Sequence, residues 1–157
     1  MPSGVAQWIS SVVQSCRKNG FVVTLFNRIR FLPHITSGRS DERHRAERQA
    51  VNSSIQGSAA DVFKKSIVAL DQAISSTFLA DHPVNFASPC FAVDHRLDVL
   101  PVLQLHDEVI FEVRTEVLTE AAKLIKSVME SAVKLKAKLL VHMRAGPSWG
   151  EMKPLVI

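Results

Sequence analysis

The sequence predicts an α+β fold in which antiparallel strands are packed against long helices. Four short runs rich in β-branched and aromatic residues have the pattern of strands in two hairpin pairs, 21–25 with 30–32 and 99–105 with 109–113. Three stretches carry apolar residues at helical spacing: 4–19, 43–74 and 116–134. The sequence has no Gly-rich phosphate loop and no strand–helix alternation, which argues against a dinucleotide-binding fold.

The first elements have clear boundaries. Asn19-Gly20 ends the first helix, because glycine tolerates the left-handed conformation found at helix ends. Phe26-Asn27 is a predicted turn, and Pro33 ends the return strand. Residues 34–42 are polar and predict an exposed loop.

The long helix has an unusual middle. Ser53, Ser54, Gly57 and Ser58 are poor helix formers that lie close together. Either a neighbouring element packs tightly against them or the backbone of a ligand approaches closely there, and the sequence leaves both explanations open. Residues 76–98 predict a loop or insertion, and Lys138–Met143 predicts a final strand.

Composition narrows the class of protein. The chain has 157 residues, a net charge of +4 and two distant cysteines. These cysteines form no disulfide framework or zinc-ligand spacing, so we expect an intracellular protein. No apolar run approaches the roughly 20 residues of a spanning helix, so no membrane partner is expected. The positive charge fits a polyanionic partner without requiring one.

Two neighbouring carboxylates lie at the predicted turn His106-Asp107-Glu108. A strand-to-strand turn holds such a pair when it is well solvated or when a cation is present. Mg²⁺ takes one or two carboxylates together with substrate phosphates, and Asp107 is the better candidate ligand at the apex. An ordinary solvated hairpin turn, in which aspartate is common, is the alternative.

A polar stripe runs along the long helix. Arg48, Asn52 and Gln56 follow at four-residue spacing, which places them within about 80° of one face. Such side chains can bind acceptors in the minor groove of a duplex; a plain solvated face is the alternative. Six arginines gather nearby and suit phosphate binding, with a mixed-charge surface loop as a strong alternative: Arg28, Arg30, Arg39, Arg43, Arg45 and Arg48.

These segments resemble the family A DNA polymerases. Residues 46–52 and 56–61 resemble the long palm helix of that family, and 103–113 resembles its third catalytic motif. The tail segments 129–135 and 148–152 are most similar to the eukaryotic theta and nu branch. The match covers most of the chain apart from 76–98, with two separated blocks in the right order.

The resemblance implies a partial polymerase domain with an antiparallel palm-type sheet. Residues 1–35 would end a fingers-like region, and 36–157 would form a palm-like region with an insertion at 76–98. The implied activity is template-directed nucleotidyl transfer with two Mg²⁺ ions, primer–template DNA and deoxynucleoside triphosphates. The theta and nu branch implies a nuclear enzyme of DNA repair or lesion bypass.

The resemblance also implies roles for individual residues. Asp107 matches one of the two metal-binding aspartates of the family, Glu108 the adjacent acidic position, and His106 the residue beside the primer terminus. The helix positions that contact the primer–template in the minor groove are matched by Arg48, Asn52 and Gln56. Arg28 falls in a segment that resembles the Gly-Arg-Arg turn near the template backbone.

Two departures affect that turn. Asn27 stands where the family has glycine, and Ile29 stands where it has an arginine. Asparagine adopts left-handed conformations, so the turn can survive the first change.

A larger departure is that the first catalytic motif and the nucleotide-gripping helix, both of which contain tyrosine, have no counterpart here; the chain has no tyrosine. We therefore expect a C-terminal part of a polymerase that does not polymerise by itself.

Two alternatives compete with this interpretation. A non-catalytic DNA-binding or regulatory fragment would keep the DNA-facing helix without a nucleotide site. A metal-dependent nuclease or phosphohydrolase would need further carboxylates converging on Asp107. The polymerase interpretation requires that Asp107 and the Arg48–Gln56 stripe meet the same end of a nucleic-acid strand.

Overall fold

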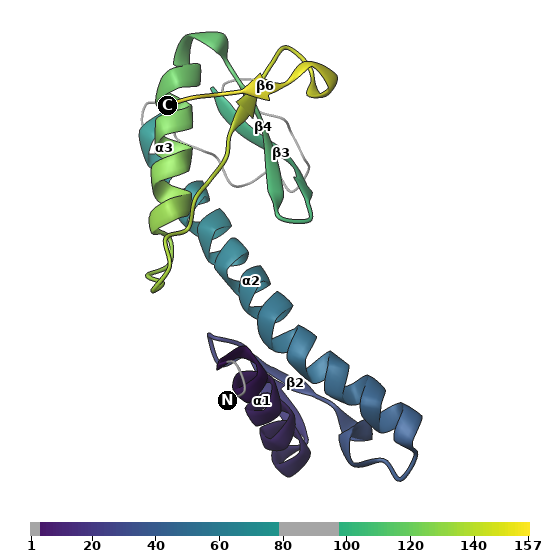
Figure 1. Ribbon diagram of the computed structural model, residues 1–157. Helices are drawn as coiled ribbons and strands as arrows, with labels where there is room; N and C mark the ends of the chain where they lie inside the picture. Colours follow the sequence, from purple (N-terminus) through teal and green to yellow (C-terminus); the bar gives the residue numbers. More distant parts are fainter. Residues whose placement is uncertain (1–3, 79–97) are drawn as a thin grey trace, which may run out of the picture. The chain divides into compact units, whose positions relative to one another are not determined.

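Figure 1 shows the computed structural model, in which residues 4–78 and 98–157 are described. Its helices and strands are α1 (Gly4–Asn19), β1 (Phe21–Val23), β2 (Ile29–Phe31), α2 (Ser40–Phe78), β3 (Val99–Leu105), β4 (Glu108–Val113), α3 (Leu118–Ser131), β5 (Arg144–Ala145) and β6 (Lys153–Pro154). The described strands pair in sequence order as three antiparallel two-stranded sheets. The predicted mixture of helices and antiparallel strands is confirmed.

The chain divides into two compact units, Met1–Val62 and Phe63–Ile157, and α2 contributes its first part to one and its last part to the other. The first unit has a core in which α1, the β1–β2 hairpin and the start of α2 meet. Its buried apolar residues are Cys16, Val22, Leu32, Ile35, Ala46 and Ala50. Small alanines on α2 allow the hairpin to approach the helix closely.

The second unit has its own core, in which the last turns of α2 pack with α3 and the β3–β4 hairpin. The buried members are Leu70, Ile74, Val99, Ala121 and Ile125, with Phe111 and Val113 partly buried beside them. In β4, Phe111 and Val113 lie on either side of the exposed Glu112, because successive side chains of a strand point to opposite faces. One face of the hairpin is therefore held by the helices.

The long helix begins earlier and ends later than predicted. Residues 40–42, expected in a loop, form the first turn of α2, and a short 3₁₀ helix occupies Pro33–Thr36. Asp41 and Glu42 favour this start, because carboxylates stabilise the positive end of a helix dipole. At the other end, residues 76–78 are helical, and residues 79–97 of the predicted insertion lie outside the described residues.

The strand predicted at Lys138–Met143 is wrong. The Glu130 side chain accepts a hydrogen bond from the Val141 N–H (3.0 Å), and Lys126 Nζ donates to the Val141 carbonyl (3.3 Å). Both backbone groups of Val141 are thus bonded to side chains of α3 instead of to a neighbouring strand. Strand pairing starts one residue after the predicted strand ends, where Arg144–Ala145 pairs with Lys153–Pro154.

Among the described helices, none combines the length and the apolar character needed to cross a bilayer.

Candidate functional site

The β1–β2 turn is docked on the middle of α2. The Leu25 N–H donates to Ser58 Oγ (2.8 Å), and Ser58 Oγ donates onward to the Ser54 carbonyl (2.6 Å). A Cβ added to Gly57 would lie 2.8 Å from Thr24 Cγ2. The cluster of poor helix formers is therefore explained by close packing of the chain against itself, which was one of the two explanations left open.

Asn27 completes this turn with a left-handed backbone, φ 62°. Its N–H donates to the Thr24 carbonyl (3.0 Å), and the hydroxyl of Thr24 accepts from the Arg28 N–H (3.1 Å). Asparagine is among the few residues that adopt this conformation readily. The prediction that the turn survives without glycine is confirmed.

Arg28 is held at the same turn by α2. Its Nε donates to Asp61 Oδ1 (2.8 Å) and its Nη2 to the Gly57 carbonyl (3.0 Å). The Asp61 side chain is 11% exposed and that of Arg28 is 50% exposed. Part of the Arg28 guanidinium is thus bonded to residues of α2. A contact between Arg28 and DNA stays a prediction.

The polar stripe predicted on the long helix lies on one exposed face of α2. Arg48, Asn52 and Gln56 are all exposed, whereas Ala50 and Ser53, on the side nearer the hairpin, are buried. None of the three stripe side chains makes a hydrogen bond or ion pair with residues 4–78 or 98–157. These three side chains are therefore accessible and have no bonding partner among the described residues. We call Arg48, Asn52 and Gln56 together the α2 ridge.

The acidic turn lies at the tip of the β3–β4 hairpin. Leu105 pairs with Glu108, so His106 and Asp107 form a two-residue loop. His106 has φ 54°, and a positive φ at the first loop residue suits the twist of a tight hairpin. Histidine accepts this conformation at a cost, and such strain is common at functional sites.

The side chains of the acidic turn face solvent. His106, Asp107 and Glu108 are exposed, and within the described parts of the chain none of them is engaged in an ion pair. Across residues 4–78 and 98–157, no three His, Cys, Asp or Glu side chains gather as a metal site. The turn thus offers two adjacent free carboxylates and leaves the rest of a metal's ligands to come from elsewhere.

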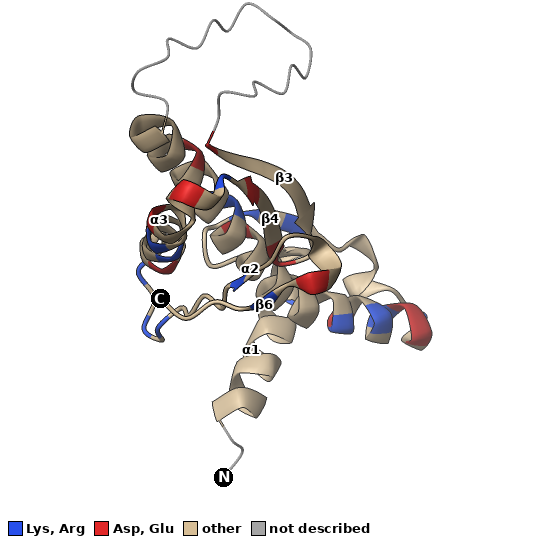
Figure 2. Ribbon diagram, turned by 90° about the horizontal axis from the view of Figure 1, so that it is seen from above, with Lys and Arg blue, Asp and Glu red and all other residues tan. Residues whose placement is uncertain are grey.

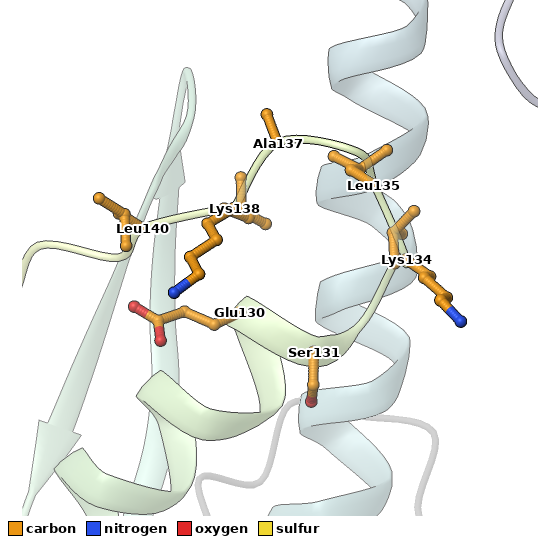
Figure 3. A pocket seen from close by; sticks show the side chains of 9 residues that line it. Glu130, Ser131, Lys134, Leu135, Ala137, Lys138 and Leu140 are labelled. Carbon is orange, nitrogen blue, oxygen red and sulfur yellow. The ribbon is translucent and has the colours of Figure 1, made fainter.

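A pocket of about 520 Å³ lies between the end of α3 and the segment that follows it. Figure 3 shows Lys138 and Glu130 extending toward each other beside it, with Lys134 pointing away. Its lining residues are Glu130, Ser131, Val133, Lys134, Leu135, Ala137, Lys138, Leu139 and Leu140. None of the predicted site residues lines this pocket.

The sequence left open which neighbour packs against Gly57 and Ser58, and it did not indicate that Asp61 binds Arg28. In the structure, Gly57, Ser58 and Asp61 hold the β1–β2 turn. Their spacing contains the signal: positions 54, 57, 58 and 61 share one helical face and are all small or polar. A buried polar face on a helix indicates a hydrogen-bonded neighbour.

Known proteins resemble both the sequence and the structure. The family model that describes DNA polymerase family A sequences matches residues 2–151 of this chain. The chain is 38% identical to DNA polymerase theta of Drosophila melanogaster over 98% of this chain and 7% of that protein. It is 37% identical to DNA polymerase I of Geobacillus stearothermophilus over 96% of this chain and 15% of that one.

A solved structure, the POL domain of Pol1 from M. smegmatis in complex with DNA primer-template and dNTP, aligns with a TM-score of 0.72. It is 34% identical, and the alignment covers 87% of this chain and 21% of that one. The chain spans less than a sixth of the curated relatives named above. The family match extends over nearly the whole sequence, and the chain belongs to DNA polymerase family A.

Proposed function

We propose that this chain supplies the primer–template-binding helix and one metal-binding aspartate of a DNA-directed DNA polymerase. By its likeness to DNA polymerase theta, we further propose a role in DNA repair or lesion bypass in the nucleus. The relative solved with primer-template and dNTP supports DNA and deoxynucleoside triphosphates as partners of the complete enzyme.

The single observation that carries the proposal is the α2 ridge. One arginine and two amides share an exposed face and have no bonding partner among the described residues. The amides can donate to the acceptors that every base pair presents in the minor groove, while arginine suits phosphate. Because those acceptors are alike for A·T and T·A pairs, the ridge would sense the shape of a duplex more than its sequence.

The acidic turn fits Mg²⁺ by the chemistry of its donors. Mg²⁺ binds oxygen ligands and takes one or two protein carboxylates, with water and substrate phosphates completing the set. Asp107 would hold the ion, with Glu108 next to it, and neither carboxylate is neutralised by a described residue. When bound, the two cations of a complete enzyme activate the primer hydroxyl and stabilise the leaving pyrophosphate.

Two further residues, His106 and Arg28, would contact the DNA. His106 lies next to Asp107 at the tip of the hairpin, where its ring can donate a hydrogen bond to the primer terminus. The remaining contact, that of Arg28 with the template backbone, would use the exposed part of its guanidinium.

We also propose that the 157-residue chain by itself does not extend a primer. Asp107 matches one of the two metal-binding aspartates, and a single aspartate does not readily hold two cations a few ångströms apart. Primer extension by the purified chain with Mg²⁺ and all four nucleotides should therefore be absent. Robust extension that Asp107→Asn abolishes would overturn this part of the proposal.

The test of the proposed function measures binding to a fluorescent primer–template by anisotropy. We expect affinity to fall with salt, because binding phosphate releases counterions. Arg48→Ala and Gln56→Ala should each weaken binding, whereas Gln14→Ala, which alters an exposed amide on α1, should not. An affinity for primer–template that is unchanged by both ridge substitutions would contradict the proposal.

A tethered cleavage reagent tests the position of the turn. Asp107→Cys in a Cys90→Ser background, labelled with an iron chelate, should cut bound DNA beside the primer terminus. The buried Cys16 should not compete for the label. The same reagent on Lys136→Cys, an exposed position of the same unit, is the control. Cutting spread evenly along the duplex would argue against placement of the turn at the primer end.

A second candidate function is a non-catalytic DNA-binding or regulatory protein. One observation favours it: the α2 ridge belongs to a unit with its own buried core. DNA binding by the ridge would then not need the acidic turn. Primer–template affinity that is unchanged by Asp107→Asn, together with absent nucleotide binding, would favour this candidate.

A further inference from the structure

Most arginines of the basic cluster between residues 28 and 48 are already bonded within the chain. They tie the β1–β2 hairpin and the loop before α2 to the helix. The bonds run from Arg28 to Asp61 and the Gly57 carbonyl, from Arg30 to Ser53, from Arg39 to Asp41 and Glu42, and from Arg43 to the Ser37 carbonyl. These four side chains therefore stabilise contacts within the first unit.

Arg45 and Arg48 differ from the rest of the cluster. Both are exposed, and neither makes an ion pair or hydrogen bond with the described residues. Figure 2 shows acidic and basic residues together on the first turns of α2, so acidic side chains are close by in the sequence. These acidic side chains are already engaged: Glu47 pairs with Arg17, and Asp41 and Glu42 pair with Arg39. Both guanidinium groups thus remain available.

The position of Arg45 on the helix coincides with the α2 ridge. A helix turns about 100° per residue, so Arg45 falls about 60° from Arg48, between the directions of Asn52 and Gln56. At about 1.5 Å per residue it lies roughly 4.5 Å before Arg48 along the axis. Ala46 and Ala50, on the other side of the helix, are buried in the core of the first unit. Arg45 thus continues the exposed stripe by almost one turn.

We propose that Arg45 is a fourth member of the ridge and binds a backbone phosphate of the DNA that the ridge contacts. The ridge then has two chemically different ends. Two guanidinium groups at 45 and 48 suit phosphate oxygens, which planar forks of donors bind in pairs. Two amides at 52 and 56 suit groove acceptors. The inference rests on the proposed function and identifies the part of the ridge that responds to salt.

The experiment compares variants of the 157-residue chain that each lose one positive charge. Arg45→Ala should weaken primer–template binding severalfold and lower the slope of log affinity against log salt by about one. Arg45→Lys should keep most of the slope, because a lysine still neutralises a phosphate. Lys18→Ala is the matched control: it removes one exposed charge from α1 in the same unit, and it should change neither quantity. Circular dichroism confirms folding of each variant.

The outcomes separate this inference from the proposed function. If Arg48→Ala weakens binding while Arg45→Ala behaves like Lys18→Ala, the inference is overturned and the proposed function stands. If neither ridge arginine affects binding, the proposed function itself fails. A loss with Arg45→Ala that depends on base sequence but leaves the salt slope unchanged would also overturn the phosphate role, since phosphate contacts carry no sequence information.

Discussion

Gly57 of α2 lies against Thr24 of the β1–β2 turn, so closely that an added Cβ would meet the threonine Cγ2 at 2.8 Å. On a free helix, replacing glycine by alanine stabilises by up to about 1 kcal/mol. Here the added methyl overlaps a stiff β-branched side chain. The small residue is therefore needed for packing, at the turn that also holds Arg28.

Gly57→Ala should lower the free energy of unfolding. We expect a net loss of about 1 kcal/mol, because overpacking costs about 1–3 kcal/mol and exceeds the gain in helix propensity. Thr24→Ser removes Cγ2 but keeps the hydroxyl that accepts from the Arg28 N–H. The double variant should therefore recover most of the loss in urea unfolding. A Gly57→Ala protein more stable than the parent would contradict this account.

Arg28 and Asp61 should be energetically coupled. Removing either partner breaks the charge-assisted hydrogen bond between Arg28 and Asp61, and the Asp61 side chain is almost buried. A double-mutant cycle with Arg28→Ala and Asp61→Asn should give a coupling of about 1 kcal/mol or more. The exposed pair Arg39–Asp41 provides the comparison, with a coupling well below that. Equal couplings for the two pairs would show that burial is not decisive.

His106→Gly should stabilise the hairpin while weakening function. Glycine accepts the positive φ of this position without steric cost, so we expect a gain of about 0.5–1 kcal/mol in unfolding free energy. Asn27→Gly is the control, with a smaller gain because asparagine tolerates φ 62°. Thermal unfolding of both variants measures the difference. A destabilised His106→Gly would indicate that the imidazole makes a contact that outweighs the strain.

Glu130→Ala should expose the amide of Val141 to exchange. The Glu130 side chain accepts that N–H at 3.0 Å, and alanine offers no acceptor. Amide hydrogen exchange of Val141 should become at least several times faster, with a stability loss of about 1 kcal/mol. Glu130→Gln keeps a carbonyl acceptor and should preserve most of the protection. Identical exchange in all three proteins would mean that another group protects this amide.

Alkaline pH should destabilise the first unit through Cys16. Complete burial raises the pKa of its thiol, so the folded chain retains a proton that the unfolded chain releases. Stability is therefore fully present below about pH 8.5, the usual pKa of a thiol, and falls as the pH rises above it. Urea unfolding from pH 7.5 to 9.5 should show this decline, and Cys16→Ala should flatten it. An unchanged slope in Cys16→Ala would assign the decline to other groups.

Local sequence signals determined much of this protein. Glycine at position 20 and the apolar spacing of 4–19 located the first helix, and the tight turn after Leu105 located the acidic hairpin. The family follows from two separated blocks of residues around Gln56 and Asp107, and it agrees with the match over residues 2–151. These features depend on neighbours in the chain, which is why a single sequence reveals them.

The tertiary structure decided what the same residues bond with. Arg28 and Arg45 look alike in the sequence, yet one is bonded to Asp61 and the other has no partner among the described residues. Val141 lies in a segment with strand-like composition, but side chains of α3 take its backbone groups. Such choices depend on contacts between distant segments, since a buried polar group is stable only where another element provides its partner.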